Sequence, residues 1–219
     1  MKRIPCLLVV LVVLIGAATI PSAASSVLIY NTLGPGNDYQ CCIGYTISGP
    51  ASTPGWIIQG NQFTALASAT VSEIDVALGY EAGLVSDATV SLWTDSGGLP
   101  GVMLGSWGVT NLPAFGTCCA VASITGLGGP VLVAGSPYFL VLSASGDTWD
   151  AWNWNSQGFI GTDVFTFDGG VTWVEDDLVV MGGAVIIGTA SVPTPEPMTC
   201  ILLGTGILGL SGAVRRRLC

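Results

Sequence analysis

Short alternations of apolar and polar residues, separated by turn residues, fill the central part of the chain. In Asp87–Thr94, the apolar side chains of Ala88, Val90 and Leu92 fall on one face of an extended chain. A period of two is typical of a half-buried β-strand. Ala69–Leu78 alternates in the same way, with one irregular step. Both segments are therefore predicted to be strands.

Turn residues follow the alternation of Asp87–Thr94. Asp95–Gly101 holds three glycines and Pro100, which favour a turn and disfavour a central ladder. Val102–Val109 is then predicted to pair back as a hairpin. Further strands are predicted at Ser26–Asn31, Phe63–Ala67, Cys119–Ile124, Tyr138–Ala144 and Leu178–Thr189. Because no segment between residues 25 and 191 has a long 3.6-residue period, we expect one all-β domain there, an antiparallel, jelly-roll-like β-sandwich.

The start of the sequence has the pattern of a secretory signal peptide, residues 1–24. Lys2 and Arg3 precede the apolar stretch Cys6–Ile20, and small residues up to Ala24 provide a cleavage site. A retained N-terminal anchor is the alternative, for which a stretch of this length is short. Export is therefore expected.

The end of the sequence, residues 192–219, has three parts. Pro195, Glu196 and Pro197 precede the uncharged stretch 198–214, and Arg215, Arg216 and Arg217 follow it. A helix over 198–214 would be roughly 26 Å long, which is enough to cross a hydrocarbon core. The arginines should stay on the cytoplasmic side. The bulk pattern alone is compatible with a plain C-terminal anchor.

This order of Pro-Glu-Pro motif, transmembrane helix and arginine cap resembles the PEP-CTERM sorting signal of Gram-negative bacteria. The resemblance implies an inner-membrane precursor that is read by an exosortase, a membrane-embedded cysteine transpeptidase, which cuts near the motif. It further implies delivery to the cell envelope, cell surface or extracellular matrix, and an association with exopolysaccharide and biofilm. It covers the sorting segment and implies nothing about the activity of the domain before it.

The central region has a resemblance of its own. The stretches SEIDVALGY, VSLWTDSGGLPGVMLGSW and PYFLVLSASGDTWDAWN are similar to the choice-of-anchor domains of secreted bacterial proteins. The likeness spans roughly Tyr30 to Gly188. It implies a secreted β-sandwich whose molecular function is generally unassigned.

Charge is distributed very unevenly. All 14 acidic residues lie between Asp38 and Glu196, whereas the five basic residues are Lys2, Arg3 and Arg215–Arg217, and histidine is absent. Because phosphate neutralisation needs cationic side chains, nucleic-acid binding is not expected. Without histidine or lysine, residues 25–191 offer no Ser-His-Asp triad, Cys-His pair or Schiff base. We expect no enzyme, and a carboxylate-based glycosidase remains the catalytic alternative.

The central cysteines form two adjacent pairs, Cys41-Cys42 and Cys118-Cys119. In an oxidising compartment we expect two disulfides that join one pair to the other, with the pairing unassigned. A four-cysteine zinc site is the alternative, although adjacent cysteines lack the usual ligand spacing.

Two clusters invite a binding function. Trp149, Trp152, Trp154 and Trp173, with Asp147, Asp150 and Asn153 nearby, suit stacking on sugar rings. The alternative is that these tryptophans fill the core, with Trp152 and Trp154 on one strand face. The acidic residues Asp163, Asp168, Glu175, Asp176 and Asp177 are candidate calcium ligands, against the alternative of a solvated acidic surface. No other cofactor is expected.

Together these patterns predict a non-enzymatic, exported surface or matrix protein that depends on the secretion machinery and an exosortase. The alternative functions are a carbohydrate-binding module that uses the Trp149–Trp173 region to bind extracellular polysaccharide, and the glycosidase. In all three cases the membrane contact would be transient.

Overall fold

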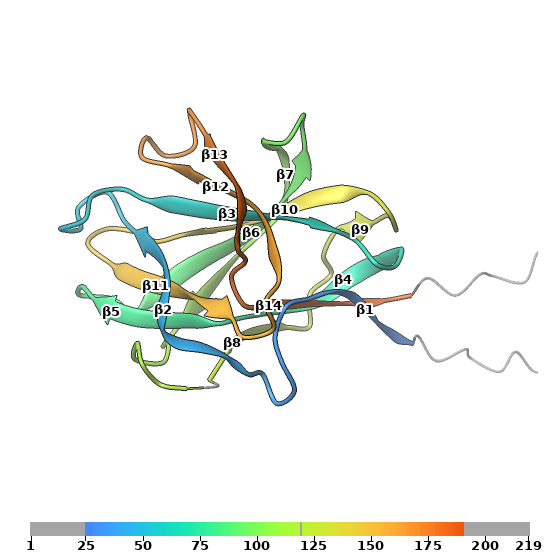
Figure 1. The fold of residues 1–219 in the computed structure, drawn as a ribbon, viewed down its shortest axis with the longest axis horizontal. Helices are drawn as coiled ribbons and strands as arrows, with labels where there is room; N and C mark the ends of the chain where they lie inside the picture. Colours follow the sequence, from blue (N-terminus) through green and yellow to red (C-terminus); the bar gives the residue numbers. More distant parts are fainter. Residues whose placement is uncertain (1–24, 119, 191–219) are drawn as a thin grey trace, which may run out of the picture. The chain divides into compact units, whose positions relative to one another are not determined.

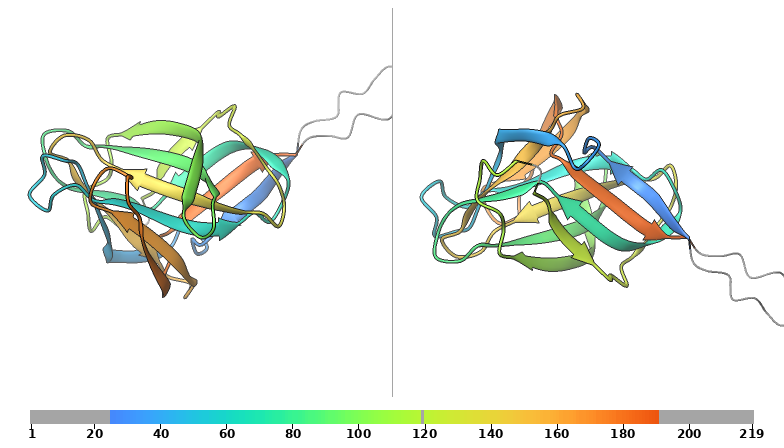
Figure 2. Two further views of the ribbon diagram at one scale, coloured as in Figure 1. Left: turned by 90° about the horizontal axis from the view of Figure 1, so that it is seen from above. Right: turned by 90° about the horizontal axis from the view of Figure 1, so that it is seen from below.

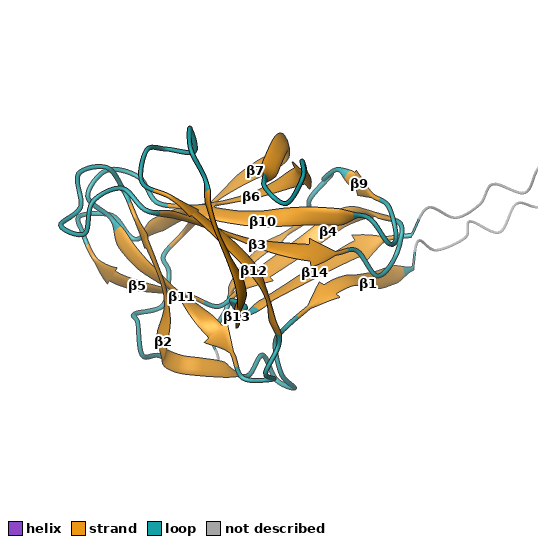
Figure 3. Cartoon of the chain, turned by 45° about the horizontal axis from the view of Figure 1, so that its top comes forward, coloured by secondary structure: helices purple, strands orange, loops and turns teal. Residues whose placement is uncertain are grey.

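The computed structural model describes residues 25–118 and 120–190. The predicted signal peptide, Cys119 and the predicted sorting segment lie outside these residues. No helix in the described part is long and apolar enough to span a membrane. Residues 26–191 form one compact unit, and the part of it that is described contains strands and loops but no helix (Figure 3).

One layer of the fold is an antiparallel six-stranded sheet (Figure 1). Its order is β13 (Val174–Val180), β12 (Ile160–Thr166), β3 (Ile58–Thr64), β10 (Pro137–Ser143), β6 (Asp87–Asp95) and β7 (Pro100–Thr110). The hairpins β6–β7 and β12–β13 form its two sides. Neighbouring strands are therefore partly consecutive and partly brought together by crossovers through the second layer.

The second layer contains two sheets. The five-stranded one has the order β1 (Ser26–Asn31), β14 (Ala184–Thr189), β4 (Ala69–Val76) and β8 (Ala122–Thr125), and β9 (Val131–Leu132) also pairs with β4. The three-stranded one has the order β2 (Tyr39–Ser48), β11 (Trp149–Asn155) and β5 (Leu78–Ala82). Only Ala77 separates β4 from β5, so one extended segment passes from the first sheet into the second.

The main hydrophobic core lies between the layers. Val90 and Leu92 of β6 point into it together with Leu140 and Leu142 of β10, and all four side chains are fully buried. The apolar face predicted from the alternation of Asp87–Thr94 packs into this core. The structure therefore confirms the predicted all-β class and the antiparallel, sandwich-like arrangement.

A smaller cluster lies on the other face of the six-stranded sheet. Its buried members are Ile58, Phe139, Val141 and Val164, and Trp93, Leu99 and Trp173 pack against them. Leu99 comes from the β6–β7 turn, and Trp173 from the β12–β13 loop. Residues from the loops at both edges of the sheet thus pack on its outer face.

Several predicted strands are placed differently in the structure. Ala69–Leu78 is divided between β4 and β5, which belong to different sheets. Leu178–Thr189 is divided between β13 and β14, because the chain leaves the six-stranded layer near Gly182 and enters the other layer. The predicted strand Phe63–Ala67 begins earlier, at Ile58, and the one predicted at Cys119–Ile124 is the shorter β8.

The first and last strands of the domain lie side by side. β1 and β14 pair antiparallel from Ser26↔Thr189 to Asn31↔Val185 (Figure 2). The start of β1 and the end of β14 are therefore at the same end of the domain.

Candidate functional site

Trp152 is a core residue. Its side chain is 0% exposed, and its indole N–H donates to the carbonyl of Gly183 at 3.0 Å. The ring lies directly on Gly182, where a Cβ atom would be 2.3 Å from Cε2 of Trp152. Trp152 is therefore inaccessible to a ligand.

The other tryptophans of the predicted cluster are dispersed. Trp154 is half-buried and packs edge-on against Tyr45, with ring centroids 5.8 Å apart. Its buried indole N–H has no hydrogen-bond acceptor among the described residues. Trp149 is half-buried, and by strand alternation it lies on the opposite face of β11 from Trp152. Trp173 belongs to the outer cluster. The structure does not gather these four rings into one surface.

The polar residues near these tryptophans have structural partners. The carboxylate of Asp147 accepts from the backbone N–H of Leu84 at 3.1 Å. Asn153 is buried, and its Nδ2 donates to the carbonyl of Ala77 at 2.9 Å. Asp150 differs from both, because its carboxyl oxygens have no hydrogen-bond partner in the part of the chain that the structure describes.

A different aromatic pair meets at the β12–β13 loop. Trp56 is 37% exposed, and its ring lies on Gly169, where a Cβ would be 2.2 Å from Cη2 of Trp56. Trp173 borders the next residue, Gly170, with Cζ2 3.6 Å from the corresponding position. Both glycines have positive φ, which explains why glycine occupies this turn. Sequence reasoning missed Trp56, because it is far from the other rings in the chain; the Gly169-Gly170 pair is the one signal that could have suggested it.

Asp168 holds this loop in shape. Its carboxylate accepts from the hydroxyl groups of Thr166 and Thr172, and from the backbone N–H groups of Val171 and Thr172 at 3.0 and 2.9 Å. These hydrogen bonds, led by that from Thr166, lower the pKa of Asp168 well below its usual range. The β12–β13 loop is consequently held in one conformation by these hydrogen bonds.

Asp163 is a buried acid on β12. It is 2% exposed, and its Oδ1 accepts from Nδ2 of Asn61 at 2.7 Å. Oδ1 of Asn61 in turn accepts from the backbone N–H of Gly182 at 2.6 Å. Burial, followed by the charge of Asp176, raises the pKa of Asp163 to about 8, against the opposing effect of the Asn61 hydrogen bond. A group that titrates there is protonated in the folded state at neutral pH.

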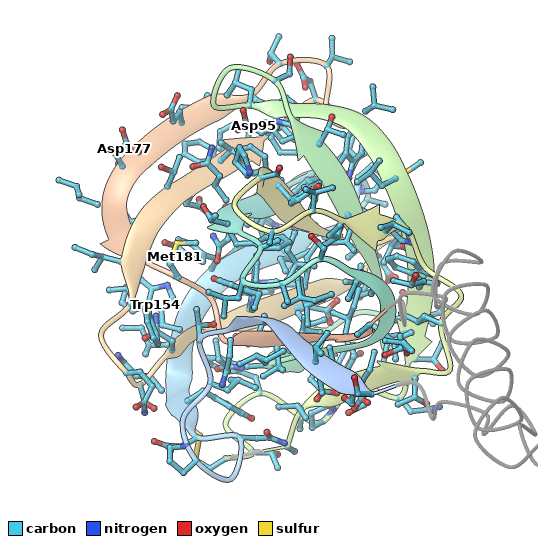
Figure 4. All side chains as sticks on the ribbon, turned by 90° about the vertical axis from the view of Figure 1, so that its right-hand side faces the viewer. Asp95, Trp154, Asp177 and Met181 are labelled. Atoms are coloured by element: carbon cyan, nitrogen blue, oxygen red, sulfur yellow. A yellow bond between two sulfur atoms is a disulfide. The ribbon has the colours of Figure 1, made fainter. Side chains whose placement is uncertain are left out.

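The five acidic residues predicted as calcium candidates do not converge. Asp163 pairs across the strands with Asp176, so both lie on one face, whereas Glu175 and Asp177 lie on the other. Asp177 accepts from the hydroxyl of Thr162 at 2.6 Å, and Figure 4 shows it at the rim of the fold. No three histidine, cysteine or acidic side chains within residues 25–118 and 120–190 are close enough to hold a metal ion.

Asp150 of β11 is another buried acid. It is 0% exposed, and neither carboxyl oxygen has a hydrogen-bond partner among the described residues. Burial, followed by the charge of Asp87, raises the pKa of Asp150 to about 7. The sequence gives no sign of this burial. Which face of β11 points inward depends on how β11 pairs with β2 and β5, and the sequence does not show that pairing.

One disulfide is present in the described part of the chain, between Cys41 and Cys118, with Cα atoms 5.4 Å apart. It joins one cysteine pair to the other, as predicted. Cys42 is exposed and unbonded among the described residues. Cys119, the remaining cysteine of the other pair, lies outside them, so the second disulfide remains a prediction. Because Cys41 and Cys118 are bonded to each other, they cannot serve as the thiolates of the four-cysteine zinc site.

Comparisons with known proteins give no family. No protein-family model matches the chain, and no curated protein matches it. Among solved structures, it is similar to the infectious bursal disease virus Gt strain structure (16% identity, TM-score 0.27), covering 84% of this chain and 50% of the viral one. The VP2 subviral particle of the same virus gives 14% identity and a TM-score of 0.27, covering 80% and 43%. The chain spans about half the length of these viral proteins, and likeness at this level says nothing about its function.

Proposed function

We propose that this chain is the precursor of a non-enzymatic protein of the cell surface or extracellular matrix, exported by a Gram-negative bacterium and sorted by an exosortase. The observation that carries the proposal is the three-part segment 192–219, with its Pro-Glu-Pro motif, apolar stretch and arginine cap. The Cys41–Cys118 disulfide supports it, because such bonds persist in oxidising compartments.

The placement of the domain's two ends also fits this proposal. Ser26 and Thr189 pair directly, so both flanking segments leave from one end of the sandwich. During export the domain would be tethered at that end, and the loops at its other end would be presented outward. Cleavage at the Pro-Glu-Pro motif would then transfer or release a finished, jelly-roll-like sandwich with a structural or adhesive role in an exopolysaccharide matrix or biofilm.

Intact mass of the protein from the envelope and medium of an exosortase-bearing host tests this proposal. We expect a species that starts near Ser25 and ends near Glu196. A variant with Pro195, Glu196 and Pro197 all changed to alanine should instead keep the arginine cap and accumulate in the inner membrane. If the unchanged protein also retains Arg215–Arg217, the segment is a plain anchor and sorting by an exosortase is wrong.

The same measurement counts the disulfides. Reduction adds two hydrogens for each bond broken, so the Cys41–Cys118 bond alone adds two. A second bond between Cys42 and Cys119 would add two more. A Cys42→Ser variant separates the cases, because it removes only the second bond.

A second candidate function is binding of polysaccharide at the aromatic loop, defined as Trp56, Phe167 and Trp173 around Gly169-Gly170. The observation that favours it is the contact of the exposed Trp56 with Gly169, in the same loop that carries Phe167, itself 62% exposed. Flat aromatic faces next to polar groups suit sugar rings. This surface replaces the Trp149–Trp173 region of the sequence prediction, in which Trp152 is buried.

Affinity electrophoresis of the protein in gels that contain host exopolysaccharide tests this candidate. Trp56→Ala should abolish the retardation, whereas Leu84→Ala, which removes an apolar side chain that is 90% exposed in another loop, should leave it unchanged. Equal retardation of both variants would exclude the aromatic loop. Release of reducing ends during the assay would reveal the glycosidase alternative.

A further inference from the structure

The carboxyl group of Asp150 lies in an unusual place for an acid. On β11 it sits between Ile47 of β2 and Tyr80 of β5, so it shares the inward face with the wholly buried Ile47. It is 0% exposed, and neither of its oxygens has a hydrogen-bond partner within residues 25–118 and 120–190. An ionised carboxylate in such a site needs a counterion or hydrogen-bond donors.

The domain offers no side-chain counterion. Residues 25–191 contain no lysine, arginine or histidine. No cationic side chain of the domain can therefore reach Asp150. The positive charge must come from a proton or from a cation in solution.

Other oxygen atoms gather close to Asp150. Thr148, two residues earlier and 1% exposed, has its Oγ1 2.8 Å from the carbonyl oxygen of Val85 and 3.2 Å from Oδ1 of Asp87. One hydroxyl proton can serve only one of these two acceptors. The Asp87 carboxylate also lies 3.2 Å from the hydroxyl oxygen of Ser145. Thr148 and Asp150 are two residues apart on an extended chain and both are buried, so their side chains lie on the same face, and the Asp87 carboxylate that contacts Thr148 lies on that side of the chain. The charge of Asp87 acts on Asp150 as well.

We propose that this neighbourhood, the Asp87–Asp150 cluster, binds a divalent cation of the calcium type. The cluster consists of the carboxylates of Asp87 and Asp150, the hydroxyl groups of Ser145 and Thr148, and the carbonyl of Val85. Calcium takes six to eight oxygen ligands from carboxylates, carbonyls, hydroxyls and water, and these are the atoms that the cluster presents. The site is separate from the acids at positions 163–177.

The strands and loops around the cluster explain what the cation would do. Val85 lies in the β5–β6 connection and Asp87 is the first residue of β6, whereas Ser145 and Thr148 lie in the β10–β11 connection. The β2–β3 connection joins them, because the backbone N–H of Ala51 donates to the carbonyl of Gly146 at 2.8 Å and that of Gly49 to Thr148 at 2.9 Å. A cation on Asp87 and Asp150 would therefore fasten one end of the six-stranded sheet to the three-stranded sheet.

Two carboxylates indicate a site of modest affinity. Calcium sites of extracellular modules have dissociation constants of about 10⁻⁴ to 10⁻³ M, and affinity rises with the number of charged ligands. We therefore expect occupancy at millimolar calcium. Magnesium should bind less well, because it demands a small octahedral site and gives up its water reluctantly.

Thermal unfolding of the full chain in mild detergent at pH 8 tests the proposal. In EDTA the midpoint should be low, and about 5 mM CaCl₂ should raise it by several degrees, since a ligand that binds only the folded state stabilises it. Equal magnesium should have a smaller effect. Asp150→Asn and Asp87→Asn should each abolish the calcium response, and Asp177→Asn, a change of equal charge outside the cluster, should keep it.

Terbium luminescence guards against a variant that fails to fold. Terbium replaces calcium in oxygen sites, and Tyr80, which pairs across from Asp150, is placed to sensitise it. Emission should appear with the unchanged protein and with Asp177→Asn, fall when calcium is added, and be absent with Asp87→Asn, whose position is only half-buried. If the unchanged protein shows neither a calcium-dependent midpoint nor emission, or if Asp87→Asn and Asp150→Asn keep both, Asp150 is simply protonated and the proposal is wrong.

Discussion

The indole of Trp152 fills the space that a side chain at position 182 would need. A Cβ there would lie 2.3 Å from Cε2 of Trp152, and the ring has no room to withdraw because it is fully buried. The backbone N–H of Gly182 is also held by Asn61. The φ of Gly182 is outside the left-handed region, so its backbone conformation does not demand glycine. Glycine is required here because the chain between β13 and β14 packs closely on Trp152 of β11.

Gly182→Ala should therefore destabilise the domain. Overpacking of a filled core costs about 1–3 kcal/mol, and the rigid surroundings place this change at the upper end. Urea unfolding followed by tryptophan fluorescence measures it. Gly108→Ala is the matched control, because nothing lies within 4 Å of the corresponding Cβ; equal stability of the two variants would contradict the packing argument.

Asp163 makes the stability of the fold dependent on pH. Two groups act on its carboxyl: Asn61 of β3 donates to it, and Asp176 of β13 lies opposite it on the paired strand. Its pKa is raised from 3.8 to about 8 in the folded protein. The folded state therefore binds a proton that the unfolded state releases between these two values.

The sign follows from this difference. The stabilisation is complete below pH 4 and is lost as the pH rises toward 8, by up to about 1.4 kcal/mol per pH unit. We expect the free energy of unfolding in EDTA to fall between pH 5 and pH 8, and Asp163→Asn to make the fall shallower, since asparagine can still accept from Asn61. The exposed Glu81→Gln should leave the slope as it is. A slope that is unaltered in Asp163→Asn would show that other groups cause the pH dependence.

At the scale of strands, local alternation predicted those elements whose neighbours are also neighbours in sequence. The β6–β7 hairpin follows directly from the pattern of Asp87–Thr94 and the glycine-rich turn after it. The division of Ala69–Leu78 into β4 and β5 does not, because a continuous alternation contains no sign of the point where an extended segment changes sheets. That point, Ala77, is set by a hydrogen bond from Asn153, a residue far away in the chain.

The candidate sites show the same limit. Composition indicated that the tryptophans and acids matter, but the face on which each side chain lies depends on register. Trp152 was therefore as good a surface candidate in the sequence as Trp56, which is the more exposed of the two. The burial of the Asp150 carboxyl likewise depends on the two strands, β2 and β5, that pair with β11 on either side.

The Cys41–Cys118 disulfide links β2 to the connection between β7 and β8. It closes a loop with a sequence separation of 77, and Tyr39 holds the same connection through its hydroxyl, which donates to the carbonyl of Thr117 at 2.7 Å. A loop of that length corresponds to about 4 kcal/mol in the chain-entropy description. The bond should thus stabilise the attachment of the three-stranded sheet.

Replacing Cys41 and Cys118 by alanine, in a Cys42→Ser/Cys119→Ser background that removes the two neighbouring thiols, should lower the thermal midpoint by many degrees. The parent Cys42→Ser/Cys119→Ser protein is the control. Reductant should lower the midpoint of the parent to that of the variant without Cys41 and Cys118 and leave the latter unchanged. If reductant has no effect on the parent, the bond contributes little to stability.

For the molecule as a whole, the acids of the domain repel one another without compensation, because the basic residues lie only in the flanking segments. Such self-repulsion destabilises the compact state. β13 concentrates it, since Glu175, Asp176 and Asp177 are consecutive and exposed. Like charges of this density also keep an edge strand from pairing with another copy.

Salt should therefore stabilise the domain. The screening length falls from about 10 Å at 0.1 M to about 3 Å at 1 M, so the repulsion between exposed carboxylates is largely removed over that range. We expect the thermal midpoint in EDTA to rise with sodium chloride, and a Glu175→Gln/Asp177→Asn variant to begin higher and rise less. EDTA separates this effect from that of calcium. Sucrose, which carries no charge, should raise the thermal midpoints of the unchanged protein and of the variant equally. A midpoint independent of salt would mean that the carboxylates are neutralised by protons in the folded state, as at Asp163.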